Sequence, residues 1–212
     1  MSYFPMFIQL KGESCLVVGG GAVALHKVEV LQDFGAAVLV TAPAILPEIK
    51  SRNGVRWREG CFDPRDLKGQ RLVVAATDCK EENHRISLLC RERGIPVNAV
   101  DQTEDCDFIF PSYLRSGEVV AAFSSGGQSP VVTQYLKERT SPVMTEVLGE
   151  LAEQLGSLRE QVKQTVDEKQ RKAVYQALLH RGLEQGAVLS WEEAEQIITA
   201  MKGNLAVGLQ KS

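Results

Sequence analysis

The stretch SCLVVGGGAVALHKVEVLQDF, residues 14–34, decides the fold of this 212-residue chain. Residues 14–19 form a short apolar run that ends in glycines, as a buried strand does. Residues 23–34 carry apolar side chains at helical spacing and stop before Gly35, a residue that favours the end of a helix. A buried strand joined through glycines to an amphipathic helix predicts one βα unit of a parallel sheet.

Further apolar runs extend this pattern through the first hundred residues. They predict strands at 37–42, 71–77 and 96–100, and a helix at 80–93 that Gly94 ends. Strands that are apolar throughout and alternate with helices indicate a parallel sheet covered on both faces. We therefore predict an α/β fold with a Rossmann-like, doubly wound parallel sheet.

The turn between the first strand and the first helix reads Gly19-Gly20-Gly21-Ala22-Val23-Ala24, which is G-x-G-x-x-A. Gly19 permits the tight turn, Gly21 lets a pyrophosphate approach the backbone, and Ala24 allows the helix to pack closely on the strand. A glycine turn without a ligand is the alternative, because this motif also occurs by chance. Its place between a buried strand and an amphipathic helix favours a dinucleotide that contacts Gly19 and Gly21.

The choice between NAD and NADP stays open at the second strand. This strand ends in Thr41-Ala42-Pro43-Ala44, which contains no acidic residue for a ribose 2′-hydroxyl and no arginine for a 2′-phosphate.

The pattern changes near residue 111. Residues 112–124 predict a small antiparallel hairpin with a turn at Ser116-Gly117. Ser129-Pro130 and Ser141-Pro142 each predict an N-cap followed by proline at the first helical position. The division we expect is a cofactor-binding domain at 1–113, a dimerisation and substrate region at 114–146, and a helical C-terminal domain at 147–212.

The C-terminal residues predict amphipathic helices. Apolar residues from Met144 to Val166 recur at intervals of three and four and form one long stripe. A helix near 167–181 ends at Gly182, and the last begins at the capping box Ser190–Glu193 and ends by residue 203. Such helices need a partner surface, either the first domain or a second subunit, and we favour a homodimer.

Composition and charge exclude several classes of protein. With 44% hydrophobic and 24% charged residues, the chain is too apolar for disorder, and no run approaches the ~20 apolar residues of a membrane-spanning helix. A net charge of -3 provides no basic excess for nucleic-acid binding. The N-terminus lacks the basic start of a signal peptide, and five scattered cysteines without a C-x-x-C pair favour reduced thiols. We expect a cytoplasmic protein that binds neither membrane nor nucleic acid.

Five segments in order resemble one known family. They are residues 4–43 with the glycine turn, VVAATD at 73–78, VNAVD at 97–101, DFIFPS at 107–112 and FSSGGQSPVV at 123–132. Together they are similar to the precorrin-2 dehydrogenases of sirohaem synthesis, including the N-terminal module of bifunctional sirohaem synthases. The resemblance implies NAD as cofactor, the tetrapyrrole precorrin-2 as substrate, sirohydrochlorin as product, and a homodimer. In some members the same cleft also inserts ferrous iron, and the sequence leaves open whether this chain does so.

The resemblance also implies site residues. Asp101 acts on the substrate as a general base, although an aspartate after a strand often only caps a turn. Ser125, Gly126 and Gly127 contact the substrate, since the N–H groups of a glycine-rich loop that opens a helix form a concavity for carboxylates. Cofactor contacts fall on the residues that flank the glycine turn and the end of the second strand. These are Ala22, Val23, Pro43 and Ala44.

Other candidates are less specific. Lys27 occupies the family's lysine position, with a solvent-facing helix lysine as the equal alternative. The acids Glu104, Asp105 and Asp107 predict a solvated loop, and the three histidines lie too far apart in the sequence to predict a metal site. Two other functions remain: a dinucleotide sensor without catalysis, which would not need Asp101, and a chelatase that has lost NAD.

Overall fold

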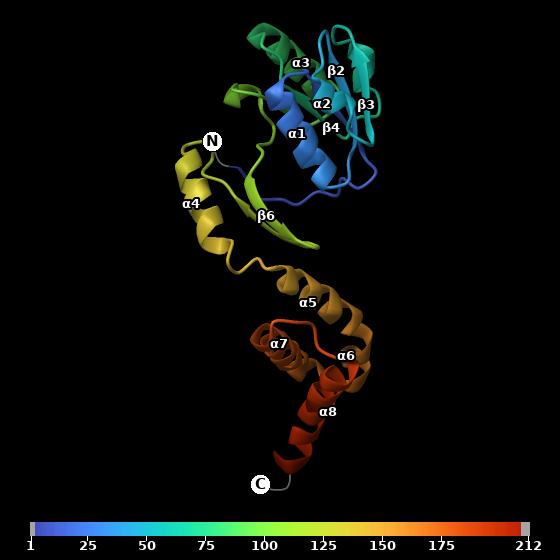
Figure 1. Ribbon diagram of the computed structural model, residues 1–212, viewed down its shortest axis with the longest axis vertical. Coiled ribbons are helices and arrows are strands. Elements are labelled where there is room, and N and C mark those ends of the chain that lie inside the picture. The colour runs from blue at the N-terminus through green and yellow to red at the C-terminus, as the bar shows by residue number, and fades with distance from the viewer. Residues whose placement is uncertain (1–2, 209–212) are drawn as a thin grey trace. The chain divides into compact units, whose positions relative to one another are not determined.

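The computed structural model describes residues 3–208 and divides into two compact units between Phe110 and Pro111. In Figure 1 the first unit runs from blue to green and the second continues to red.

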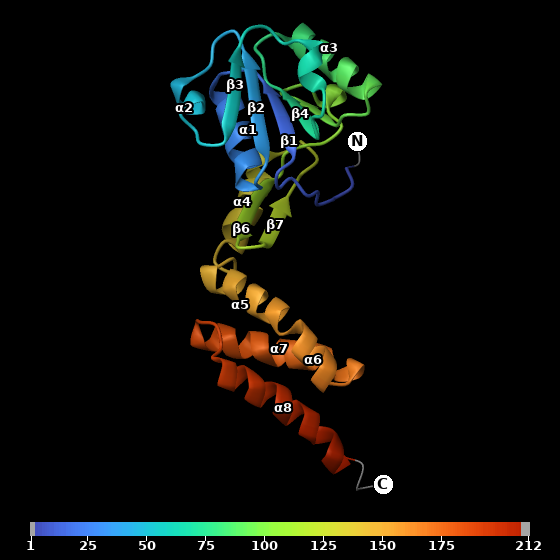
Figure 2. The same cartoon turned by 90° about the vertical axis from the view of Figure 1, so that its right-hand side faces the viewer.

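The first unit contains a five-stranded sheet in which every paired neighbour is parallel. The strands are β1 (Ser14–Val18), β2 (Ala37–Ala42), β3 (Val55–Glu59), β4 (Leu72–Ala75) and β5 (Val97–Ala99). Their order is β3-β2-β1-β4-β5, so the chain starts in the middle and winds outward in both directions (Figure 2). This confirms the predicted doubly wound parallel sheet.

Helices α1 (Ala22–Asp33) and α3 (Lys80–Glu92) cover opposite faces of the sheet. Side chains of β1 alternate between them: Cys15 and Val17 pack in the cluster with α1, and Leu16 and Val18 in the cluster with α3. All four are buried, and each fully buried aliphatic side chain stabilises the fold by about 1.5–3 kcal/mol. The apolar run of β1 is continuous because its side chains pack against the helix layer on each face of the sheet.

Four elements of the first unit were not predicted. They are β3, the short helix α2 (Pro47–Lys50) and the 3-10 turns η1 (Pro64–Leu67) and η2 (Thr103–Asp105). Strand β3 reads VRWRE and none of its residues is fully buried. It lies at the edge of the sheet, where charged side chains reach solvent and discourage pairing with other chains, so it lacks the apolar run of the inner strands.

The second unit begins with the predicted hairpin. Strands β6 (Ser112–Ser116) and β7 (Val119–Phe123) pair antiparallel around Gly117 and Glu118. Helix α4 (Pro130–Thr140) follows, and the Ser129 hydroxyl accepts the Val132 N–H at 3.4 Å, as the predicted N-cap requires.

The predicted N-cap at Ser141 is wrong. The Ser141 N–H donates to the carbonyl of Lys137 at 2.9 Å, so this residue ends α4. The N-cap of helix α5 (Glu146–Ser157) lies four residues later, where the Thr145 hydroxyl accepts the Leu148 N–H at 3.3 Å. A serine followed by proline can stand at either end of a helix. The hydrogen bond from the Ser141 N–H to the Lys137 carbonyl shows that Ser141 stands at the end of α4.

Three boundaries in the helical part also differ from the prediction. The stripe is divided at Leu158 into α5 and α6 (Arg159–Thr165), α7 (Glu168–Gln185) runs past Gly182, and α8 (Trp191–Gly208) runs past residue 203. A Cβ at position 182 would collide with the side chain of Leu151, so this glycine serves close helix packing rather than termination. The residue that ends α7 is Gly186, which has a left-handed φ of 69°.

The apolar stripe finds its partners within the second unit. Helices α5, α6, α7 and α8 pack side by side (Figures 1 and 2). Their shared core consists of Leu158, Val162, Val166, Val174, Leu178, Leu189, Ala194 and Ile198. Neither the first domain nor a second subunit is needed to bury this stripe, so it gives no independent argument for a dimer.

In residues 3–208 no helix combines the length and the apolar character that crossing a membrane requires.

We predict that Gly149→Ala destabilises the second unit. Gly149 of α5 lies against the backbone of Ser116, and an added Cβ would collide with it. The free energy of unfolding should fall by about 1–3 kcal/mol, measured by urea denaturation. Gly156→Ala in the same helix is the control, since its Cβ would meet nothing within 4 Å and should add about 0.5–1 kcal/mol. Equal stability of the two variants would contradict the packing described.

Candidate functional site

The carboxyl ends of the five parallel strands surround one cavity of about 1100 Å³ in the first unit. This edge is where doubly wound sheets bind ligands, because the loops after neighbouring strands diverge there. The lining includes residues 19–23 after β1, residues 41–46 at the end of β2 and after it, Cys61 and Phe62 after β3, residues 76–80 after β4, and Val100 and Asp101 after β5. Helix α3 adds Glu82, Asn83 and Arg85.

The glycine turn has the geometry that its sequence predicts. Gly19 has a φ of 131°, and a Cβ there would collide with the carbonyl of Ala76, so only glycine fits. Gly21 is the N-cap of α1, has no side-chain cap, and an added Cβ would meet nothing within 4 Å. The open space above Gly21 and the N–H groups at the start of α1 fit a pyrophosphate.

The end of β2 forms the neighbouring wall of the cavity. The carbonyl of Thr41 accepts the Gly19 N–H at 2.9 Å and ties the two strand ends together. The Thr41 hydroxyl is buried and has no hydrogen-bond partner within the described part of the chain. An unsatisfied buried hydroxyl in a cavity wall indicates a site for a polar ligand or water. The six sequence-predicted cofactor residues, Gly19, Gly21, Ala22, Val23, Pro43 and Ala44, all line this cavity.

Asp101 follows β5, at the opposite edge of the sheet from β2 and β3, and lines the same cavity. Its φ is 60°, and among the described residues it is the one non-glycine residue with positive φ. Aspartate tolerates this left-handed conformation better than most residues, but a constrained backbone beside a cavity is a frequent property of functional sites. The side chain is exposed and forms no ion pair with the side chains that the structure describes, those of residues 3–201.

Lys27 of α1 is close enough to Asp101 for the two charges to interact. Its Nζ lies 4.2 Å from the centroid of the Phe110 ring, and the side chain is half-buried. Burial lowers the pKa of the ammonium, and the nearby Cys106 and Asp101 partly oppose that shift. Lys27 is therefore not the freely solvated helix lysine that the sequence left as an alternative.

The prediction of a solvated acidic loop after Asp101 is wrong for Asp105, which is 2% exposed. Its two carboxylate oxygens each lie 2.8 Å from Nδ1 of His84, and the Ser87 hydroxyl donates to one of them at 3.1 Å. Gln102 also donates to this carboxylate, at 3.2 Å. These bonds fix the η2 turn, and with it the segment that carries Asp101, onto α3. No local signal distinguishes Asp105 from its exposed neighbours, because its partners on α3, His84 and Ser87, lie 21 and 18 residues away in the sequence.

A second anchor that the sequence did not reveal is Asn83, which is 1% exposed. Its Oδ1 accepts the Thr77 N–H at 3.1 Å, and its Nδ2 donates to the Thr77 carbonyl at 3.1 Å. The loop after β4 is thereby held against the start of α3, which fixes one wall of the cavity.

The predicted substrate loop, residues 124–129, lies in the second unit, whereas the cavity lies in the first. The Ser125 hydroxyl accepts the Ser129 N–H at 2.9 Å and donates to the Ser129 carbonyl at 3.0 Å. Gly126 and Gly127 follow with φ of 66° and 83°. Ser125 thus closes the loop on itself, and its hydroxyl is already engaged.

The described residues also bear on metal binding. Within residues 3–208 no three His, Cys, Asp or Glu side chains are placed to hold a metal ion together.

Comparison with known proteins agrees with this geometry. A family model described as "Putative NAD(P)-binding" matches residues 6–112, which is half of the chain. Siroheme synthase from Methylococcus capsulatus is 41% identical over 171 residues, covering 79% of this chain and 36% of that protein. Siroheme synthase from Methylobacillus flagellatus is 35% identical over 216 residues, covering 98% of this chain and 46% of that protein. This chain therefore spans less than half the length of these curated relatives.

A solved structure shares the fold over nearly the whole chain. "SirC, precorrin-2 dehydrogenase" superposes with a TM-score of 0.65 at 22% identity, covering 94% of this chain and 99% of that one. At this identity the likeness establishes the fold, which comprises the parallel sheet, the small hairpin and the helical C-terminal part. The matched family model spans the glycine turn and all five strand ends that line the cavity, so the chain belongs to the NAD(P)-binding family that this model describes.

Proposed function

We propose that this protein is an NAD-dependent dehydrogenase that oxidises precorrin-2 to sirohydrochlorin in sirohaem biosynthesis. The observation that carries the proposal is that the glycine turn and Asp101 line one cavity, so a hydride acceptor and a base can meet there. Relatives named siroheme synthase and the fold shared with a precorrin-2 dehydrogenase support the choice of substrate.

Different residues of the cavity bind different parts of the dinucleotide. The turn at Gly19 and Gly21 and the start of α1 hold the pyrophosphate, while Pro43 and Ala44 border the adenosine side, where Rossmann folds bind the ribose. Bound NAD supplies the hydride acceptor. In the sheet order β5 lies on the side opposite β2 and β3, so Asp101 lies toward the other half of the dinucleotide.

Asp101 completes the reaction as the proton acceptor. Oxidation of the macrocycle removes a hydride and a proton, and the hydride passes to the dinucleotide while the carboxylate takes the proton. The buried contact between Asp105 and His84 holds the turn after Asp101 against α3. It therefore supports this step by positioning the segment that carries the Asp101 carboxylate. A carboxylate on a fixed backbone loses less entropy when it meets its substrate.

The loop of Ser125, Gly126 and Gly127 is proposed to bind carboxylates of the substrate. It opens α4, whose N-terminus attracts negative charge, and two successive glycines with positive φ shape it. Ser125 contributes by holding that shape, since its hydroxyl bonds to Ser129.

We also propose that the protein is a homodimer whose contact region is 114–146, between a cofactor domain at 1–113 and a helical domain at 147–212. Support comes from α4, which has no buried residue. Its exposed apolar side chains are Val131 (76% exposed), Val132 (50%), Tyr135 (58%) and Leu136 (39%). An exposed apolar patch of this kind usually marks a surface that contacts another protein. A cytoplasmic location is proposed as well, because none of the five cysteines is in a disulfide.

We predict that Asp101→Asn abolishes turnover but leaves NAD binding unchanged. Asparagine keeps the shape and tolerates the positive φ, so only the base is lost, and kcat should fall by about 10²–10⁴-fold. The assay follows NADH absorbance and the sirohydrochlorin spectrum after mixing the protein with NAD and precorrin-2. If the unaltered protein binds NAD yet yields neither signal, the protein is a sensor. Full activity in the variant would remove Asp101 from its role.

We predict that Gly21→Asp weakens NAD binding. The new carboxylate would lie where the pyrophosphate approaches, and Kd should rise at least tenfold, or about 1.4 kcal/mol. Folding should persist, because aspartate is a favourable N-cap residue and the site is open. Gly21→Asn, with similar bulk and no charge, should have the smaller effect in the same calorimetric titration. Unchanged affinity in the aspartate variant would mean that NAD binds elsewhere.

We predict that Val131→Glu shifts the protein from dimer to monomer. A charge in the centre of an apolar contact is costly to bury, whereas the same charge on the exposed surface of a monomer is tolerated. Sedimentation velocity should give twice the chain mass for the unaltered protein and for Leu183→Glu, a control at another exposed leucine, in α7. A monomer at all concentrations without any substitution would contradict the proposal.

A further inference from the structure

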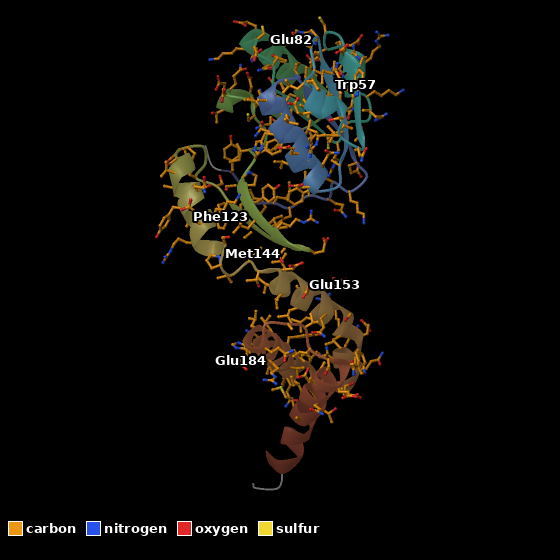
Figure 3. All side chains as sticks on the ribbon, in the orientation of Figure 1. Trp57, Glu82, Phe123, Met144, Glu153 and Glu184 are labelled. Atoms are coloured by element: carbon orange, nitrogen blue, oxygen red, sulfur yellow. The ribbon has the colours of Figure 1, made fainter. Side chains whose placement is uncertain are left out.

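The end of β2 has no side chain that could distinguish NAD from NADP, but another element supplies charged groups to the same cavity. Glu82 and Arg85 of α3 both line it, although they follow β2 by some forty residues in the sequence. Glu82 is labelled in Figure 3 and comes from this helix. The structure therefore offers a charged pair where the local sequence offered none.

A contact of Arg85 with the segment after β3 relates this pair to the adenosine side of the cavity. In this fold the ribose of the adenosine half binds at the end of β2, next to the pyrophosphate at the glycine turn. Phe62 follows β3, the strand beside β2, and the guanidinium carbon of Arg85 lies 5.5 Å from the centroid of its ring. Arg85 thus lies against the segment that follows β3, the strand next to β2.

The carboxylate of Glu82 binds the guanidinium of Arg85. Nε of Arg85 donates to one carboxylate oxygen of Glu82 at 2.8 Å, and Nη2 donates to the other at 2.8 Å. Hydrogen bonding from Arg85 lowers the pKa of Glu82, so this carboxyl is charged near neutral pH. The Glu82 side chain is 29% exposed and that of Arg85 is 49% exposed, so both remain accessible to a ligand.

The charges around the cavity act against the 2′-phosphate of NADP. The lining contains three carboxylates, Asp78, Glu82 and Asp101, against the two cations Lys80 and Arg85. A 2′-phosphate adds up to about two negative charges and binds best to an arginine with free N–H groups. Here Glu82 binds the Nε–Nη2 edge of Arg85, one of the two edges that could hold a phosphate, and the phosphate would meet the Glu82 carboxylate beside it.

We infer that Glu82, by binding Arg85, determines the preference of this site for NAD over NADP. The inference depends on dinucleotide binding at the glycine turn but not on oxidation of precorrin-2. When a neutral side chain replaces Glu82, Arg85 becomes available to a 2′-phosphate, and the repulsion between the phosphate and the carboxylate disappears. Glu82 is thus the acidic residue that β2 lacks, supplied from α3.

The test is calorimetric titration of the full chain with NAD and with NADP, without tetrapyrrole. The unaltered protein should bind NAD more tightly. Glu82→Gln should strengthen NADP binding relative to NAD by about tenfold or more, since removing one like charge in a partly buried site is worth at least that. Adding Arg85→Met to this variant should cancel the gain.

Glu81→Gln is the matched control, because it removes the same charge from the same turn of α3 at a position outside the cavity lining. It should leave the ratio of the two affinities unchanged. An unaltered protein that prefers NADP, an unchanged ratio in Glu82→Gln, or a gain that survives Arg85→Met would overturn the inference. If Gly21→Asp affects neither ligand, the proposed binding site itself has failed, which is a separate result.

Discussion

The contact between the glycine turn and the loop after β4 is the constraint on which the rest of the site depends. Gly19 packs so closely on the carbonyl of Ala76 that no side chain can stand between them, and its N–H bonds to Thr41. One residue therefore joins the ends of β1, β2 and β4. Because these ends are held together, the first turn of α1 faces the cavity and its N–H groups remain free for an anion.

Around this fixed centre, the outer walls are positioned by contacts from α3. Asn83 holds the loop after β4, Asp105 is bound by His84, and Arg85 lies over Phe62. The same helix thus orders the segment that follows Asp101 and the adenosine side of the cavity. One turn of a helix can do this because consecutive side chains point about 100° apart around its axis, so Asn83, His84 and Arg85 reach different segments.

The predictions from sequence succeeded where the signal was local and failed where it was not. The inner strands were predicted because both their faces are apolar, whereas β3 was missed because an edge strand carries charge. Gly35 and Gly182 look alike in the sequence, yet the first follows a helix end and the second lies inside α7 against Leu151. Of three neighbouring acids in one loop, only Asp105 is buried, and its partners lie on another element.

The sequence by itself determined the parallel sheet, the dinucleotide turn and the residues after β2 and β5 that line the cavity. These follow from hydrophobic periodicity and from the conformational freedom of glycine, which are properties of short segments. Only the tertiary structure decided that the helical stripe is buried within its own unit, that Asp105 is an anchor, and that Glu82 and Arg85 bind each other in the wall of the cavity. Each of these depends on which distant segments come into contact, and no short segment carries that information.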